Sequence, residues 1–278
     1  MRIDLHAHSL VSDGTDTPAE LVAAAAAAGL DVVALTDHDT FDGLPEARAQ
    51  AERSGVRLVE GIEISTKRNG VSVHLLGYGC DPGDEALARE LAQVREGRVQ
   101  RLPLMLAKLA ELGMPLTPAD VAAQVGASPS VGRPHVADAL VAKGYLANRT
   151  EAFTSYLADG GPAWVPRRTI EVGRAIDLVH EAGGVAVIAH PWARVSRGVL
   201  GADALAGLVA EHRLDGIEAD HGDHDPDIRA QLRALADELG LLVTGSSDYH
   251  GTGKVGHDLG SELTAPEVFN ELARRLGW

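Results

Sequence analysis

Apolar runs of strand length alternate with longer amphipathic stretches along most of the chain. The runs are rich in Val, Ile and Leu and cover residues 3–5, 32–35, 57–64, 71–77, 185–189, 216–219 and 241–245. Ala- and Leu-rich segments of helical character lie between most of them, at residues 18–28, 44–54, 170–181, 203–211 and 226–239. This alternation predicts an α/β fold, with a mostly parallel sheet and crossover helices. About seven strands favour a closed or nearly closed barrel over an open sheet.

Two stretches depart from this rhythm. The run at 71–77 follows the run at 57–64 through the short segment KRNG, so the two are expected to pair as a hairpin. Residues 81–168 contain several helical patterns (84–112, 118–125, 134–143 and 150–157) without a strand between them. We therefore expect a barrel formed by residues 1–80 and 169–278, interrupted by a helical insertion at 81–168.

Composition narrows the class of protein. With 278 residues, 45% of them hydrophobic, the chain is long enough for a substantial core. A single cysteine, Cys80, excludes an intramolecular disulfide, and no apolar leader or 18-residue apolar span is present, so we expect a cytoplasmic protein without membrane contact. The net charge of -15 argues against non-specific nucleic-acid binding, although bound cations can reverse the sign locally.

Ionisable side chains are concentrated where the predicted strands end. In a parallel barrel the carboxyl ends of the strands open on one face, so groups from six separate segments are expected to meet there. These groups are His6, His8, Asp13, Asp37, His38, Asp39, Glu63, His74, His190, Asp248 and His250.

The spacing of these groups favours metal binding. Side chains two residues apart in extended backbone point the same way, so His6 and His8 can hold one ion, as can Asp248 and His250. A set of nitrogen and oxygen donors without thiolate suits Zn, Mn, Fe or Co rather than a structural zinc site. Nine ligands exceed the coordination of one ion, which favours two or three divalent ions with Glu63 as a candidate bridge.

Each residue taken singly has a plainer explanation. A histidine on a strand is more often a buried core residue than a ligand, and Asp13 precedes Gly14 in a common turn pair. His190 precedes Pro191 and could simply end a strand. The coincidence of six such placements at strand ends is what favours the metal site.

The segments HAHSLVSDGT, ALTDHDT, GIEIS, VHLLGY, AHP and SSDYHG together resemble the PHP (polymerase and histidinol phosphatase) superfamily of metal-dependent phosphoesterases. The resemblance implies a distorted seven-stranded (β/α)7 barrel with a trinuclear metal site. One metal would be bound by His6, His8, Glu63 and Asp248, a second by Glu63, His74 and His190, and a third by Asp13, His38 and His250. Asp37 and Asp39 would orient ligands or transfer protons, and the carboxylate of Asp13 replaces a histidine found in some branches.

The segments SPSVGRPHVADALV and GGPAWVP are similar to a narrower branch, which acts on nucleoside 3′,5′-bisphosphates and, as an RNase AM-like exonuclease, on RNA 5′ ends. In that branch the positions of Arg133 and His135 contact a substrate phosphate, with Ser130 nearby. Arginine suits bidentate phosphate contacts, but Arg133 could also merely begin a helix. Separately from the resemblance, His221 falls at a strand end and could line the pocket.

Arg167 and Arg168 are weaker candidates for phosphate binding, since a basic pair at the end of a loop is usually solvated. The net charge makes short substrates more plausible than long RNA unless such basic residues gather on one rim.

The expected reaction is metal-assisted hydrolysis of a phosphate ester, with His250 or Asp39 as the acid–base group. No serine or cysteine has the setting of a nucleophile elbow, and no GxxxxGK[ST] loop is present. The favoured activity is removal of the 3′-phosphate from nucleoside 3′,5′-bisphosphates, with trimming of short RNA from its 5′ end as an extension. Two alternatives stay open: another phosphomonoesterase, such as a histidinol-phosphate phosphatase, and a metal-binding module without catalysis. The oligomeric state stays open too.

Overall fold

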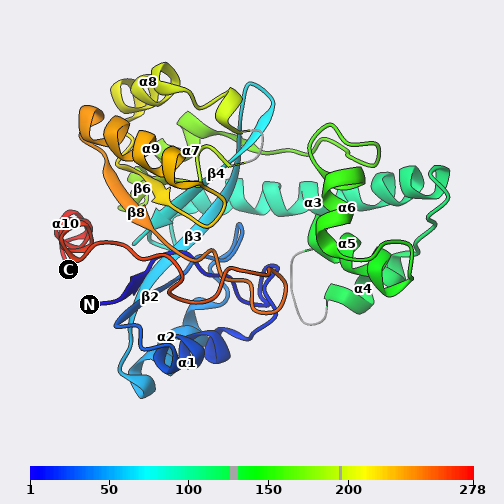
Figure 1. Ribbon diagram of the computed structural model, residues 1–278, viewed down its shortest axis with the longest axis horizontal. Helices are drawn as coiled ribbons and strands as arrows, with labels where there is room; N and C mark the ends of the chain where they lie inside the picture. The colour runs from blue at the N-terminus through cyan, green and yellow to red at the C-terminus, as the bar shows by residue number, and fades with distance from the viewer. Residues whose placement is uncertain (126–130, 194–195) are drawn as a thin grey trace.

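The computed structural model describes residues 1–125, 131–193 and 196–278. A barrel forms one end of the molecule, and a smaller helical lobe lies to its side, joined to it by one long helix, α3 (Figure 1). Within the described residues, no helix is both long and apolar enough to span a membrane.

Seven strands build the barrel in the order β1-β2-β3-β4-β6-β7-β8, and the short β5 pairs with β3. All neighbouring strands are parallel except that β4 runs antiparallel to both β3 and β6. The strands are β1 (Ile3–Asp4), β2 (Val32–Leu35), β3 (Arg57–Arg68), β4 (Val71–Tyr78), β5 (Ile170–Glu171), β6 (Val185–Ala189), β7 (Gly216–Asp220) and β8 (Leu242–Gly245). The predicted seven-stranded α/β barrel is confirmed.

The expected hairpin joins β3 and β4. Its two turn residues, Asn69 and Gly70, have φ values of 49° and 79°, the left-handed conformation that a two-residue Asn-Gly hairpin requires. Because β4 runs backwards, its first half lies beside the carboxyl end of β3, with His74 opposite Ser65. The first half of this antiparallel strand thus places His74 at the mouth of the barrel.

The barrel is nearly closed where the end of β1 meets the chain that follows β8. A parallel bridge joins Ala7 to Tyr249. The buried carboxylate of Asp4 accepts the backbone N–H groups of Ser247 at 3.0 Å and Gly260 at 2.8 Å. These contacts hold together two segments that are more than 240 residues apart in the sequence.

Helices cover the outside and the closed end of the barrel. In Figure 1, α1 and α2 lie below the strands, and α8 and α9 lie above them. The barrel interior is filled by apolar side chains such as Leu5, Leu76 and Val187, and α10 contributes Phe269 and Leu272 to the same cluster. The helices of the barrel are α1 (Pro18–Ala27), α2 (Leu44–Ser54), α7 (Val172–Glu181), α8 (Ala202–His212), α9 (Pro226–Leu239) and α10 (Pro266–Leu276), with a 3-10 turn at Ser196–Gly198.

The lobe has its own apolar cluster. Its helices are α3 (Glu85–Glu111), α4 (Pro118–Val125), α5 (Arg133–Ala142) and α6 (Arg149–Ala152), followed by a π turn at Phe153–Leu157. Leu87 and Leu91 in the first part of α3 pack in the barrel core, whereas Met105 and Leu109 pack with α4–α6. We propose a division of the chain into barrel and insertion as the sequence suggests, with α3 shared between them.

Most predicted elements are present within a few residues of their expected limits. One prediction is wrong: residues 170 and 171, expected to begin a helix, form β5, because they pair with Thr66 and Lys67 of β3. The third strand also continues to Arg68, beyond the expected end at Ile64, since it pairs with β4 along its whole second half. Helix α10 was not foreseen.

We call the junction between the end of β1 and the chain after β8 the barrel seam. Its contribution to stability can be tested at Asp4. Replacing Asp4 with Ala leaves the N–H groups of Ser247 and Gly260 buried without acceptors, so we expect the free energy of unfolding to fall by about 2–4 kcal/mol. Urea denaturation measures this change, with Asp237→Ala on the exposed face of α9 as the control. A loss no larger than that of the control would show that the seam is held by other contacts.

Candidate metal centre

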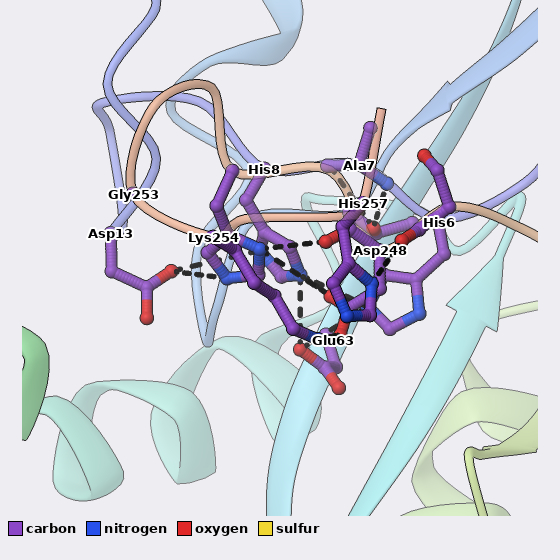
Figure 2. Close-up of polar contacts among 12 residues, drawn as sticks. His6, Ala7, His8, Asp13, Glu63, Asp248, Gly253, Lys254 and His257 are labelled. Carbon is purple, nitrogen blue, oxygen red and sulfur yellow. Dashed lines mark hydrogen bonds and ion pairs between the residues drawn. The ribbon is translucent and has the colours of Figure 1, made fainter. Parts of the chain in front are cut away.

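All nine predicted ligand side chains meet at the mouth of the barrel. His6, His8, Asp13, Glu63 and Asp248 converge from strands and loops distant in sequence (Figure 2). Ligand atoms lie within 4.8 Å of one another in four groups. Three contain only predicted ligands and are made of His8, Asp13, His38 and His250, of His6, His8 and Asp248, and of His38, Glu63 and His74; the fourth is made of His221, Asp248 and His257. His190 joins them through Glu63.

Glu63, in the middle of β3, is the centre of this arrangement. Its Oε1 lies 2.8 Å from His74 Nδ1 and 3.2 Å from His190 Nε2. Its Oε2 lies 3.1 Å from His38 Nδ1 and 3.2 Å from His8 Nε2. One almost fully buried carboxylate therefore faces imidazoles from four segments, as expected of a group that bridges metal ions.

Two further carboxylates flank Glu63. Asp248 Oδ1 lies 3.4 Å from the Nε2 atoms of both His6 and His8. Asp13 lies on the other side, with its Oδ1 3.3 Å from His250 Nε2. Glu63 thus lies between Asp13 and Asp248 at the mouth of the barrel.

The loop that carries Asp13 is held by hydrogen bonds to the segment that follows β2. Asp37 accepts hydrogen bonds from the backbone and hydroxyl of Ser9 and from the hydroxyl of Ser12. A Cβ at Gly14 would lie 2.3 Å from the carbonyl oxygen of His8, so only glycine fits this turn. The motif SDG therefore folds back over the end of β1 and brings Asp13 to the site.

Three non-glycine residues with positive φ occur at the ends of barrel strands, at the mouth. They are Asp39 (57°), His190 (29°) and Asp248 (53°). This conformation costs free energy for residues with a Cβ, and such strain is concentrated at functional sites. The sharp turns aim His190 and Asp248 into the centre.

The pKa values reflect competition between burial and neighbouring charges. Burial alone would raise the pKa of Glu63, but the imidazoles that surround it hold it well below its usual value. Burial lowers the pKa of His38 to about 3, whereas Asp248 and Glu63 raise the pKa of His8 to about 9 against the effect of burial. Protonated imidazoles such as His8 thus balance the carboxylates of the site, and a bound cation would take over that charge.

Two observations indicate that these residues are arranged to bind cations. The Nε2 atoms of His6 and His8 lie 2.9 Å apart, so one ring can donate a hydrogen bond to the other, and both nitrogens are close enough to bind the same cation. His38 Nδ1 is buried and has no hydrogen bond in the described part of the chain, although Glu63 Oε2 lies 3.1 Å away. A buried polar atom without a hydrogen-bond partner, such as His38 Nδ1, is expected where an ion binds.

The structure gives Asp39 different surroundings from those expected of an acid–base group. Its carboxylate is fully buried, contacts Arg98 Nη2 at 2.6 Å and accepts the backbone N–H of Ser65 at 2.7 Å. Burial would raise its pKa, but Arg98 and its other neighbours lower it to about 2. An ionised carboxylate with these partners does not donate a proton at neutral pH, so the acid role does not fit Asp39, whereas its role as a base stays a prediction.

His250 is placed as the sequence suggests, but its two predicted roles compete. Its Nδ1 lies 2.9 Å from the backbone carbonyl of Asp248, which leaves Nε2 facing Asp13. An Nε2 that binds metal cannot transfer a proton at the same time, and the geometry favours the ligand role.

The predicted phosphate-binding residues Arg133 and His135 contact different neighbours from one another. Arg133 donates to Asp159 at 2.6 Å and to the carbonyl of Leu157 at 2.9 Å. His135 Nδ1 accepts the N–H of Gly132 at the start of its own helix. Ser130 lies outside the described residues.

His221 lies next to the site and contacts the predicted ligand Asp248. It is fully buried, its Nε2 lies 3.2 Å from Asp248 Oδ2, and its Nδ1 accepts the N–H of Asp223. With both ring nitrogens engaged, His221 orients Asp248 in this structure and does not face open space.

Sequence reasoning missed two charged groups that contact the predicted ligands. Glu218 in β7 lies 3.1 Å from His6 Nδ1 and accepts the backbone N–H of His190. Lys254 forms an ion pair with Asp248, and both are labelled in Figure 2. A glutamate inside the apolar run GIEA was a signal for Glu218, whereas nothing local marks Lys254.

Comparisons with known proteins agree with this geometry. The PHP domain family matches residues 4–115. A 3′,5′-nucleoside bisphosphate phosphatase from Chromobacterium violaceum is 36% identical, over 99% of this chain and 96% of its own. A 5′-3′ exoribonuclease from Escherichia coli is 37% identical, over 89% of this chain and 84% of its own. A phosphoribosyl 1,2-cyclic phosphate 1,2-diphosphodiesterase from Eggerthella lenta is 38% identical, over 91% and 96%.

A solved structure of a candidate metal-dependent phosphoesterase from Bifidobacterium adolescentis has the same fold. It superposes with a TM-score of 0.93 at 38% identity and covers 98% of this chain and 96% of its own. The full-length relatives share hydrolysis of phosphate esters, and the barrel mouth described above has the donor set that such chemistry needs. The chain therefore belongs to the PHP-domain family of phosphoesterases.

Proposed function

We propose that this protein is a metal-dependent phosphomonoesterase that removes the 3′-phosphate from nucleoside 3′,5′-bisphosphates. The observation that carries the proposal is the convergence of imidazoles on Glu63, flanked by Asp13 and Asp248, at the open end of the barrel. The full-length similarity to a bisphosphate phosphatase supports the substrate class.

The proposal includes two or three divalent ions, of Mn, Fe or Zn. The donor atoms form more groups than one ion can use, and Glu63 faces several of them. Divalent ions held there would activate a water molecule and neutralise the phosphoryl oxygens of the substrate.

The residues of the chain supply positioning and charge balance. Glu218 orients His6 through its ring Nδ1, and His221 orients Asp248. Lys254 places a positive charge beside Asp248 at the rim of the mouth, where it can neutralise a substrate phosphoryl oxygen once that carboxylate binds metal. None of these contacts singles out one proton donor for the leaving oxygen.

Short substrates fit the electrostatics better than long ones. The net charge of -15 opposes extended nucleic acid outside the mouth, because phosphate binding relies on a basic footprint. We therefore propose 5′-end trimming of short RNA as a second activity of the same site, supported by the similarity to an exoribonuclease.

The first test is a comparison of substrates with Mn²⁺-supplemented protein. Adenosine 3′,5′-bisphosphate is expected to yield phosphate and AMP, and a short 5′-phosphorylated RNA is expected to shorten more slowly. Phosphate release is measured colorimetrically and products by chromatography, with histidinol phosphate as the control. Cleavage of histidinol phosphate without cleavage of either nucleotide substrate would replace the proposed specificity, and inactivity towards all three at full metal occupancy would argue for a module without catalysis.

Removing two ligands should stop the reaction. In the Asp13→Ala, His38→Ala double variant one side of the mouth loses a carboxylate and an imidazole, and we expect the turnover to fall by at least ~10³-fold. His212→Ala is the matched control, because His212 pairs with Asp177 between the outer helices α7 and α8. Steady-state phosphate release measures the change, and undiminished turnover in the double variant would rule out the metal mechanism.

We expect Glu218 to affect the binding of metal and not the binding of substrate. Glu218→Gln removes the charge that orients His6, so we expect metal affinity to fall by about 10–100-fold. Isothermal titration with Mn²⁺ measures the affinity, with Glu238→Gln on the exposed face of α9 as the control. Equal affinities in the two variants would mean that His6 needs no such partner.

A further inference from the structure

The helical lobe contacts the loop that follows β8 through the side chain of Arg149. Arg149 begins α6, and its Nη1 donates a hydrogen bond at 2.9 Å to the backbone carbonyl of Gly253, which is 104 residues away in sequence. Gly253 lies between His250, a predicted metal ligand, and Lys254; Gly253 and Lys254 are labelled in Figure 2. We call residues 250–254 the rim loop.

The guanidinium group of Arg149 is fixed by Asp138 of α5. Its Nε donates to Asp138 Oδ1 at 2.8 Å and its Nη2 donates to Asp138 Oδ2 at 2.5 Å, the bidentate geometry of a strong arginine–carboxylate pair. Burial alone would lower the pKa of Arg149, but Asp138 and, at the metal centre, Asp13 raise it above its usual value. Arg149 therefore stays charged, and its remaining nitrogen, Nη1, faces the rim loop.

The rim loop is shaped to accept this guanidinium group. A Cβ at Gly253 would lie 2.7 Å from Arg149 Nη1 and 3.1 Å from the carbonyl oxygen of His250, so a side chain at this position would force Arg149 away. Gly251 has a φ of 62°, and a Cβ there would lie 1.9 Å from Thr15 Oγ1. The two glycines thus let the loop pass close to its neighbours on both sides.

Thr15 holds the rim loop from the barrel side. The hydroxyl of Thr15 accepts the backbone N–H of Thr252 at 2.9 Å, and Thr15 follows the predicted ligand Asp13 by two residues. Asp13 Oδ1 in turn lies 3.3 Å from His250 Nε2. The loop is thus attached to the segment that carries Asp13 as well as to the lobe.

The lobe has further contacts with the barrel beside the metal centre. Asp159 accepts the N–H of Ser72 in β4 at 3.3 Å, and Arg98 of α3 pairs with Asp39 at 2.6 Å. Ser72 is two residues before one predicted ligand, and Asp39 directly follows another. These contacts fix the lobe relative to the mouth, so the lobe can serve as the support from which Arg149 holds the rim loop.

Two side chains of the metal centre depend on where the rim loop lies. His250, at its start, faces Asp13, and Lys254, at its end, forms an ion pair with Asp248. A shift of the carbonyl between them moves the backbone on either side, so it would draw both side chains away from their partners.

We propose that Arg149 is a positioning residue of the metal centre, which holds the rim loop from the lobe and so keeps His250 in place to bind a divalent ion and Lys254 at the rim of the mouth. This inference rests on the proposed function and deepens it. Outer partners that orient metal ligands contribute substantially to metal affinity. Loss of Arg149 should therefore weaken metal binding although Arg149 acts only through the backbone of Gly253.

The experiment measures Mn²⁺ binding in Arg149→Met and Arg149→Lys. Methionine keeps the apolar stem but makes none of the three hydrogen bonds, whereas lysine keeps the charge without the planar fork. We expect the dissociation constant of at least one Mn²⁺ ion, measured by isothermal titration, to rise by about 10–100-fold in Arg149→Met and by less in Arg149→Lys.

Arg275→Met is the matched control, and its Mn²⁺ affinity should equal that of the wild-type protein. Arg275 is 29% exposed, compared with 22% for Arg149, and it also pairs with an aspartate. Its partner, Asp215, lies just before β7, at the end of that strand away from the mouth.

Steady-state kinetics gives a second readout. Excess Mn²⁺ should restore kcat in Arg149→Met, because mass action refills a weakened ion site. The KM for adenosine 3′,5′-bisphosphate should stay raised by about 10-fold, because Lys254 is displaced whether or not the ions are bound. A loss of kcat that excess Mn²⁺ leaves unchanged would contradict the inference.

Thermal stability separates positioning from a merely structural role. A fixed concentration of Mn²⁺ should raise Tm less in Arg149→Met than in the wild-type protein, whereas Arg275→Met should keep the full increase. If Arg149→Met lowers Tm but binds Mn²⁺ with wild-type affinity, the side chain only stabilises the lobe and the proposal is wrong. Should Arg149→Met fail to fold, Arg149→Lys decides, and wild-type Mn²⁺ affinity in that variant would refute the proposal.

Failure of the proposed function gives a different result. If the wild-type protein cleaves none of the tested phosphate esters, the phosphatase proposal fails, and Mn²⁺ affinity alone then decides the role of Arg149. If the wild-type protein is active and Arg149→Met matches it in Mn²⁺ affinity and in KM, the phosphatase proposal stands and the role of Arg149 is refuted.

Discussion

The structure depends on burying several carboxylates and imidazoles together at the mouth of a barrel. Glu63 is almost fully buried, yet it stays ionised because imidazoles approach it from several sides. Isolated carboxylates in such surroundings would take up protons, since burial disfavours the charged form. Mutual charge compensation therefore decides which groups can share this space, and bound cations complete that compensation.

This constraint explains how the barrel differs from a regular one. Strand β4 runs against its neighbours, and this reversal brings His74 to the carboxyl end of β3. Positive φ angles at His190 and Asp248 turn their side chains inward where each strand ends. Strain of this kind persists only when the surrounding structure holds it, and the packed strands and the seam at Asp4 provide that support.

The helical lobe adds a second charge environment next to the first. Its arginines are oriented by carboxylates adjacent to the metal-site residues, so the two environments share a boundary at Asp39 and Asp159. The acidic remainder of the surface limits how much of a longer nucleic acid can follow.

Sequence alone predicted the seven barrel strands, most helices and the nine candidate ligands, because hydrophobic periodicity and strand-end position are local properties of the chain. Histidines and carboxylates directly after apolar runs, as in LHAH and LTDHD, mark the mouth without any knowledge of packing. Tertiary structure alone decided what each charge faces. Asp39 lies within one residue of a candidate ligand but is neutralised by Arg98, 59 residues away. Glu218, Lys254 and Arg149 acquire their meaning only from neighbours distant in sequence, because electrostatic pairing depends on separation in space.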